Sequence, residues 1–318
     1  MGRYIIRRLL INIPVLLGIT ILVFLFTRLT PGDPVLAYMS PELGRNQEMV
    51  DRMRRQLGLD QPYAVQYVRW LGKTVQGDLG YRMVGGQSVR ATLGRALRAS
   101  GLLMGTALTL GCLIGIPLGV FSALRQYSRL DFFLTTLAFL GISTPSFLLG
   151  LGGLYLFGLK LNLFPIGGIA SATGEGSLLD SLHHLALPSM ILGFGYIAIL
   201  MRYTRSSMLE VVRATYVTTA RAKGLHEGLV VFRHAFRNAL IPILTIIGLA
   251  LPEMVGGAVI TETVFTWPGM GSLLIDSVNG RDYSMLMGIS LSVAVAVLIA
   301  NLITDIAYAF ADPRIRYQ

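Results

Sequence analysis

Charged residues and cysteine are scarce in this chain of 318 residues. Asp, Glu, Lys and Arg make up 14% of it, whereas soluble domains carry about 25%. The single cysteine, Cys112, lies inside an apolar run, which excludes an intramolecular disulfide and a cysteine metal cluster. The mean hydropathy is +0.62, and apolar residues gather in runs of about 20, the length that crosses a bilayer as a helix. The composition therefore predicts a polytopic membrane protein.

Histidines are also few, and their positions exclude the usual intramembrane enzymes. The four histidines are His183, His184, His226 and His234. The first two fall in a predicted outer loop and the other two in a basic cytoplasmic segment, so Ser143 has no base at membrane depth. Asp305 is the one aspartate well inside a predicted span, so an aspartyl pair is missing as well. We therefore expect no catalytic residues and no metal site.

A complete nucleotide-binding loop is also missing. Gly72-Lys73-Thr74 copies the end of a P-loop, but Tyr67 stands where its first glycine belongs. The net charge of +10 does not indicate nucleic acid, because the sequence has no lysine-rich tail and its charges lie beside the apolar runs. We expect that this chain itself binds no cofactor and no nucleic acid.

Six apolar runs predict six transmembrane helices. The first run, Leu9–Phe26, follows Arg3, Arg7 and Arg8 and lacks a signal-peptide cleavage site, so residues 1–30 are expected to form a retained first helix. The other five are expected at about residues 101–124, 132–157, 187–206, 240–264 and 286–310. The predicted fold class is an all-α polytopic membrane protein.

The positions of Lys and Arg predict the orientation in the membrane. These residues concentrate in the N-terminus, the 125–131 loop, the 201–239 segment and the tail at 312–318. On the opposite side, apart from the long 31–100 stretch, only Arg28, Lys160 and Arg281 are found. Since positive charge marks the cytoplasmic side, both termini are expected there, and residues 31–100 are expected to form an extracytoplasmic domain. Helix-like patches within that domain are Val50–Leu57 and Tyr63–Leu71.

The segment from Met201 to Pro242 is the most informative part of the sequence. It carries seven Lys or Arg and two Glu between two apolar runs. Leu209, Val212, Tyr216 and Ala220 recur at helical spacing and predict one apolar stripe, and Gly224 is typical of a residue that ends a helix. A first helical part, a glycine that ends it and a second helical part are the arrangement expected of a docking element. An amphipathic loop lying on anionic lipid has the same pattern.

Two acids fall inside predicted spans. Glu253 and Asp305 each cost several kcal/mol there if unpaired, so they are expected to face a partner or an aqueous path. Proton coupling through both, as in a secondary transporter, is the alternative function. Glu262 lies near the outer end of its span and is expected to be interfacial.

Several longer motifs resemble one family. Tyr216–Leu225 and Arg233–Pro242 resemble the cytoplasmic coupling loop of type I ABC importer permeases, in particular the first permease subunit of dipeptide and oligopeptide importers. Further runs that resemble signatures of this family are Arg3–Leu10, Thr30–Pro34, Ser143–Phe147, Gly256–Phe265, Trp267–Gly271 and Asp312–Tyr317. The resemblance covers essentially the whole chain. It departs where such permeases carry Glu-Ala-Ala and this chain has Thr218-Thr219-Ala220, so no role of that glutamate is carried over.

The resemblance implies a permease core at 101–311 with its coupling loop at about 207–238. The residues that would meet an ATPase are Tyr216, Ala220, Arg221, Lys223, Gly224, Arg233 and Arg237. The residues that would lie on the translocation path are Ser143, Pro145, Glu253 and Asp305.

The resemblance also implies partners and a location. This chain would form half of a path for peptides across a bacterial cytoplasmic (inner) membrane, in contact with membrane lipid. A second homologous permease would form the other half, two cytoplasmic ATP-binding subunits would hold ATP and Mg, and an extracytoplasmic substrate-binding protein would deliver the cargo. Related permeases serve dipeptides, longer peptides, glutathione, nickel chelates or oligosaccharides, so the sequence leaves the cargo open.

Overall fold

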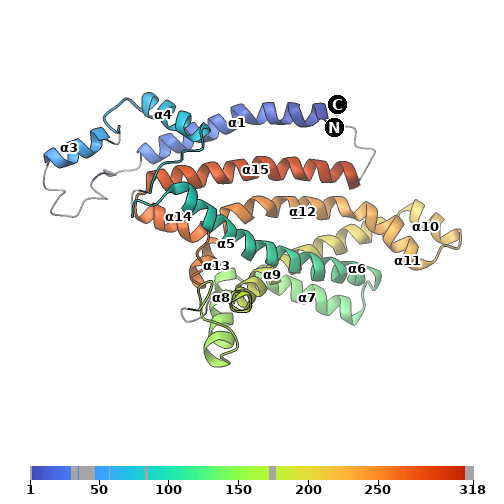
Figure 1. Ribbon diagram of the computed structural model, residues 1–318. Coiled ribbons are helices and arrows are strands. Elements are labelled where there is room, and N and C mark those ends of the chain that lie inside the picture. Colours follow the sequence, from blue (N-terminus) through green and yellow to red (C-terminus); the bar gives the residue numbers. More distant parts are fainter. Residues whose placement is uncertain are drawn as a thin grey trace.

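A computed structural model shows the chain as a set of long helices with shorter ones at both ends (Figure 1). It describes residues 2–29, 35, 47–56, 58–82, 85–171 and 177–311. The Thr30–Pro34 motif and the tail at 312–318 lie outside the described residues. Within the described part, the only strand-like pairing is an isolated bridge between Tyr81 and Ser88. The predicted all-α class is confirmed.

Among the described residues, five helices are long and apolar enough to cross a membrane, or six if one bent pair counts as a single span. The long elements are α1 (Gly2–Leu29), α5 with α6 (Val89–Leu110 and Ile116–Leu124), α9 (Leu178–Val212), α12 (Arg237–Gly256) and α15 (Tyr283–Ala311). The short helices are α3 (Gln47–Gln56), α4 (Tyr63–Val75), α10 (Thr215–Ala222), α11 (Glu227–Leu229), α13 (Val259–Val264) and α14 (Met270–Asn279). Helices α3 and α4 confirm the helix-like patches in the predicted outer domain.

The third predicted span is not one helix. Helix α7 (Arg129–Ser143) and the following pair, α8 (Ser146–Gly153) with a π-helical stretch (Leu154–Lys160), meet at an angle of 99°. Pro145 causes the break, because a residue that precedes proline avoids the helical region. Thr144 accordingly takes an extended conformation with φ −86° and ψ 125°. The prediction of a continuous helix at 132–157 was wrong.

The fifth predicted span ends earlier than expected. Helix α12 stops at Gly256, and Gly257 takes φ 80° before the short α13 begins. A β-carbon at Gly257 would stand 2.4 Å from the backbone nitrogen of Gly271, so only glycine permits this close approach. The prediction of one continuous helix over 240–264 was therefore wrong, because the chain breaks at Gly257 and Ala258 and residues 259–264 form a separate short helix.

Small residues bring α5, α6 and α9 into close contact. Gly111, Gly115 and Gly119 follow one another at four-residue spacing, and a β-carbon on any of them would stand 2.6 or 2.7 Å from atoms of α9. A π-helical turn, Gly111–Gly115, joins α5 to α6 without a break in the rod. Such small-residue spacing lets membrane helices approach each other closely. The second span is a continuous helical element from Val89 to Leu124, longer than the sequence predicted.

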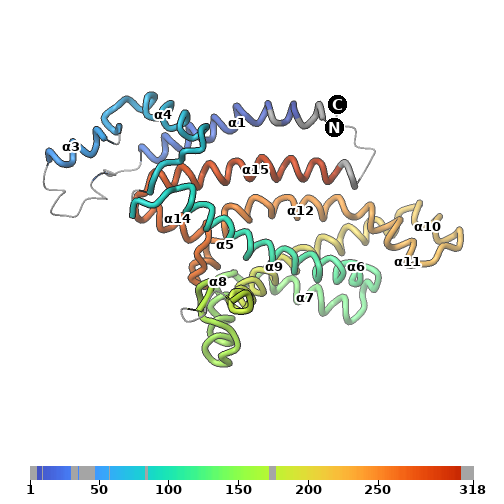
Figure 2. The backbone as a smooth tube through the Cα atoms, viewed as in Figure 1, coloured from blue at the N-terminus to red at the C-terminus, as the bar shows by residue number. Residues whose placement is uncertain are grey.

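The two ends of the bundle differ in what they carry (Figure 2). One end holds the start of α1, the loop between α6 and α7, and the α10–α11 segment. The opposite end holds α3, α4 and α14. The described segments that the sequence assigned to the cytoplasm therefore gather at one end of the helices.

Candidate functional site

The predicted coupling segment forms a helical hairpin at one end of the molecule. Helix α9 ends at Val212, α10 follows, and Gly224 then takes φ 76°. Its backbone N–H donates to Arg221 O at 2.9 Å, which closes the turn. Helix α11 and a π-helical stretch (Val230–Phe236) lead on into α12. The predicted helix stop at Gly224 is confirmed.

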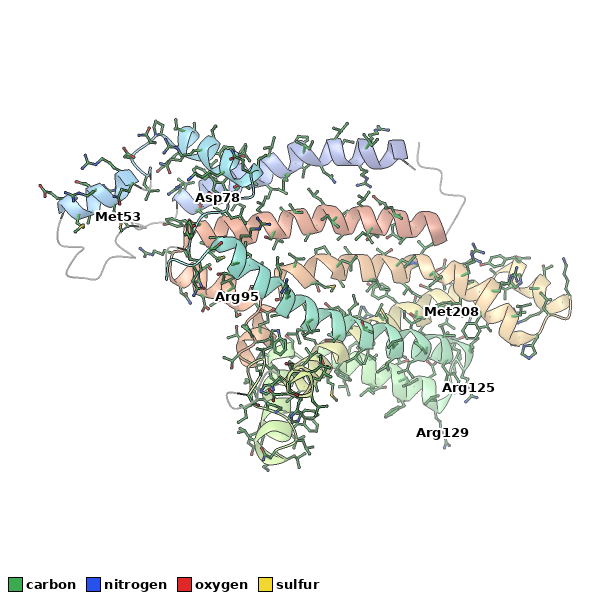
Figure 3. The ribbon with its side chains drawn as sticks, viewed as in Figure 1. Met53, Asp78, Arg95, Arg125, Arg129 and Met208 are labelled. Carbon is green, nitrogen blue, oxygen red and sulfur yellow. The ribbon has the colours of Figure 1, made fainter. Side chains whose placement is uncertain are left out.

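A core of this chain's own side chains lies beneath the hairpin. Val217 and Ala220 of α10 are 0% and 6% exposed. They belong to one apolar cluster with Met208 of α9, Val120 of α6 and Val231. Figure 3 labels Met208, which lies between these helices. The hairpin is thereby joined to two long helices.

Ala220 was expected on the face that meets an ATPase, but it is buried in the apolar cluster of this chain and does not lie on the exposed face of the hairpin. The apolar stripe predicted from the sequence assumes one continuous helix over residues 209–220. In the structure α9 ends at Val212, and the chain turns before α10 starts at Thr215. The turn rotates the second helix relative to the first. Val217 and Ala220 therefore point inward, and Tyr216 is 46% exposed.

The exposed side chains of the hairpin are mostly polar and basic, and four are large and apolar: Tyr216, Leu225, Leu229 and Phe232. Tyr216, Arg221, Lys223, Arg233 and Arg237 are all exposed there. Leu225, which sequence reasoning missed, is exposed directly after the glycine turn, and that position was the available signal.

One ion pair spans the glycine turn. Arg221 Nη2 donates to Glu227 Oε1 at 2.7 Å. The hydrogen bond to Glu227 raises the pKa of Arg221 above its ordinary value. Both groups are well exposed, so the pair contributes at most about 1 kcal/mol and its main effect is to orient the turn.

A buried ion pair fixes the neighbouring loop. Arg205 of α9 donates to both carboxylate oxygens of Asp131, at 2.7 and 2.9 Å. Ser122 and the backbone N–H of Tyr127 also donate to this carboxylate. A bidentate, charge-assisted pair is strong and directional, so the α6–α7 loop and α9 move as one unit. The available signal was an acid at the start of a span, three residues after Ser128.

A cavity of about 450 Å³ lies between α5, α7, α8, α9 and α12. Among the described residues that line it, Glu253 is the only carboxylate, and Tyr196 donates a hydrogen bond to Glu253 Oε2 at 3.0 Å. Thr144 and Ser146, at the break between α7 and α8, also line it, whereas Ser143 and Pro145 do not. Sequence analysis did not predict a break here and did not single out Thr144 or Ser146, the two neighbours of Pro145 that line the cavity.

Asp305 does not line this cavity. It forms an ion pair with Arg8 across α15 and α1, with Nη2 2.7 Å from Oδ2. Glu253 and Asp305 therefore engage different partners, and Asp305 holds the first helix to the last one.

Glu262 is fully buried, which corrects its expected place at the interface. Its carboxylate accepts hydrogen bonds from Ser100 Oγ at 2.6 Å and from the backbone N–H groups of Gly271 and Ser272 at 2.7 and 3.0 Å. A further N–H, from Ala258, lies 3.2 Å away. Gly271 and Ser272 open α14, so the negative charge lies at the positive end of that helix. The residue therefore joins α5, α13 and α14.

Comparison with known proteins identifies the family. Residues 115–317 match the family model for the binding-protein-dependent transport system inner membrane component, and residues 1–106 match the model for the N-terminal part of such components. The chain belongs to this family. Together the two matches cover nearly the whole chain, so the resemblance noted in the motifs is confirmed.

Similar proteins match from end to end. A putative peptide permease protein of Brucella suis is 46% identical over 317 residues, covering 99% of each chain. An oligopeptide transport system permease protein of Bacillus subtilis is 44% identical over 318 residues, and a dipeptide transport system permease protein of Escherichia coli is 37% identical over 339 residues, each covering the whole of both chains. This chain is thus a multi-pass inner-membrane permease subunit of an ABC importer and not an enzyme.

Proposed function

We propose that this chain forms half of the translocation path for peptides in an ATP-driven importer of the bacterial cytoplasmic membrane. Its full-length similarity to permeases named for peptide, oligopeptide and dipeptide transport supports this cargo. The observation that carries the mechanism is the α10–α11 hairpin, whose outer face is exposed and whose inner face is locked to the long helices.

ATP and Mg would be held by two cytoplasmic partner subunits that dock on this hairpin. Tyr216 and Leu225 would enter a groove of the partner, and Arg221, Lys223, Arg233 and Arg237 would surround them. Closure of the two ATPases would then pull the hairpin. Because Val217 and Ala220 are packed against Met208, the pull would reach α9 and α6 as a rigid-body movement.

The cavity beside Glu253 would form part of the path, completed by a second homologous permease. The break near Pro145 bends the wall of this cavity, and Ser143 stands next to it. Both termini and the hairpin would lie in the cytoplasm. Residues 31–100 would lie outside, where the substrate-binding protein delivers its cargo.

Replacement of Gly224 by valine tests the coupling. The glycine has φ 76°, and no atom lies within 4 Å of the position a β-carbon would take, so the penalty of about 1–2 kcal/mol is local backbone strain. Gly85 is a matched control, since it has φ 81°, similarly open space and a place on the opposite side of the predicted membrane. The complex is reconstituted with the second permease, the ATPases and the binding protein.

Uptake of a labelled dipeptide and ATP hydrolysis stimulated by the binding protein are measured on the same vesicles. Gly224→Val is expected to lower uptake at least tenfold, and Gly85→Val less than twofold. Normal uptake by Gly224→Val, or an equal loss in both variants, would show that the hairpin does not couple the two processes. A wild-type complex that imports oligosaccharide but no peptide would overturn the proposed cargo.

A further inference from the structure

A second pocket lies between α1, α4 and α15, away from the candidate path. Its volume is about 190 Å³, several times the roughly 30 Å³ that one water occupies in the liquid. Three cations, Arg28, Arg69 and Lys73, line it together with one carboxylate, Asp78. Figure 3 shows Asp78 beside α4 and the far end of α1.

The three cations have no acidic partner in the described part of the chain. None of the ion pairs found there includes Arg28, Arg69 or Lys73. The guanidinium of Arg28 lies over the rings of Phe24 and Tyr283, 5.2 and 5.7 Å from their centroids. The pocket thus gathers three positive charges beside two aromatic rings, and the single carboxylate in its lining, Asp78, balances only one of them.

A buried acceptor in the same pocket also lacks a partner. Gln66 is 8% exposed, and its Nε2 donates to Leu59 O and Gln61 O. Its Oε1 is buried without a hydrogen bond, and a small rotation of the side chain toward the pocket would let a ligand supply the missing donor. A ligand that combines negative charge with a hydrogen-bond donor would satisfy both features.

The position of α4 indicates where such a ligand comes from. Tyr67 packs against Phe24 of α1, and its hydroxyl lies 2.9 Å from Thr20 Oγ1, so α4 lies along a membrane-spanning helix. Gln66, Arg69, Trp70 and Lys73 line the pocket. Val68 and Val75 are 67% and 79% exposed, and such an apolar face on a polar helix is typical of an element lying in the membrane interface.

We propose that this pocket binds the head group of a phospholipid in the leaflet that borders α4. Arg28, Arg69 and Lys73 surround its phosphodiester. Gln66 Oε1 accepts a hydrogen bond from a head-group hydroxyl, which favours phosphatidylglycerol over phosphatidylcholine, because the choline group has no donor and brings a positive charge toward the cations. The bound lipid holds α4 against α1 and α15. This site is independent of the proposed cargo.

Native mass spectrometry of the full-length chain, delipidated in detergent, tests this site. The chain is titrated with dioleoyl phosphatidylglycerol, dioleoyl phosphatidylcholine or free glycerol 3-phosphate. The double variant Arg69→Gln/Lys73→Gln is compared with Arg52→Gln/Arg55→Gln, which removes the same charge from exposed positions on α3 outside the pocket. The first variant is expected to raise the dissociation constant for phosphatidylglycerol at least tenfold, and the second less than twofold.

Wild-type protein is expected to bind phosphatidylglycerol at least tenfold more tightly than phosphatidylcholine. Equal effects of the two double variants would show non-specific charge attraction and overturn the site. Equal affinity for the two lipids would overturn the role of Gln66. Binding of glycerol 3-phosphate as tight as that of the lipid would make this a site for soluble phosphate esters and overturn the lipid assignment.

Discussion

Replacing Glu262 by alanine is expected to destabilise the fold by about 4 kcal/mol. The carboxylate is 0% exposed and accepts from Ser100 and from the N–H groups of Ala258, Gly271 and Ser272. Each buried donor left without a partner costs about 1–3 kcal/mol. The serine hydroxyl can rotate toward another acceptor, so its loss costs little. The three backbone N–H groups left unpaired cost about 1 kcal/mol each, and the small cavity left by the side chain accounts for the rest.

Thermal melting in detergent measures this loss. Trp267 is fully buried and its backbone N–H donates to Glu262 O at 2.7 Å, so its fluorescence reports on this region. One kcal/mol shifts the melting temperature by about 2–4 °C in domains of 150–250 residues, so a fall of roughly 8 °C or more is expected. Glu262→Gln keeps one acceptor oxygen and should lose about half as much.

Asp276→Ala provides the control, because this residue is also on the α13–α14 side of the molecule but exposed. An exposed substitution of this kind changes stability by at most about 0.5 kcal/mol. If Glu262→Ala melts within about 2 °C of the wild type, as the control should, the buried hydrogen bonds do not stabilise this region. A double-mutant cycle with Ser100→Ala should give a coupling energy of about 1 kcal/mol or more.

Two further predictions concern packing and topology. Ala220→Trp should overpack the apolar cluster, destabilise the fold by about 3 kcal/mol or more and so reduce the yield of folded protein. Thr219 is exposed on the same helix, so Thr219→Trp should fold normally. Equal yields of the two variants on size-exclusion chromatography would contradict the inward position of Ala220. In a Cys112→Ser background, a cysteine that replaces Gln47 should react with an impermeant maleimide in intact cells, and one that replaces Glu227 should not. The reason is that the two positions lie at opposite ends of the bundle. The reverse labelling would show that the predicted orientation is inverted.

Local patterns in the sequence predicted the features that depend on short stretches of chain. Apolar runs of helical length predicted the membrane-spanning helices because each span must satisfy its own backbone hydrogen bonds in lipid. Gly224 predicted a turn because few other residues tolerate φ 76°. The same patterns could not place Ala220, because its inward position follows from a turn at residues 213–214 that apolar spacing does not reveal.

Contacts between distant residues were decided by the tertiary structure alone. The local sequence predicts that Glu262 is an acid at the membrane interface. Only the approach of Ser100 and α14 makes it a buried acceptor. The sequence also suggests that Asp305 lies on the translocation path. The tertiary structure instead brings Arg8 of α1 to Asp305, and the two form an ion pair. Helical periodicity indicates which faces of one helix are apolar. Contacts between helices depend instead on how closely the helices approach, which small residues such as Gly115 permit. The sequence of a single helix does not encode that approach.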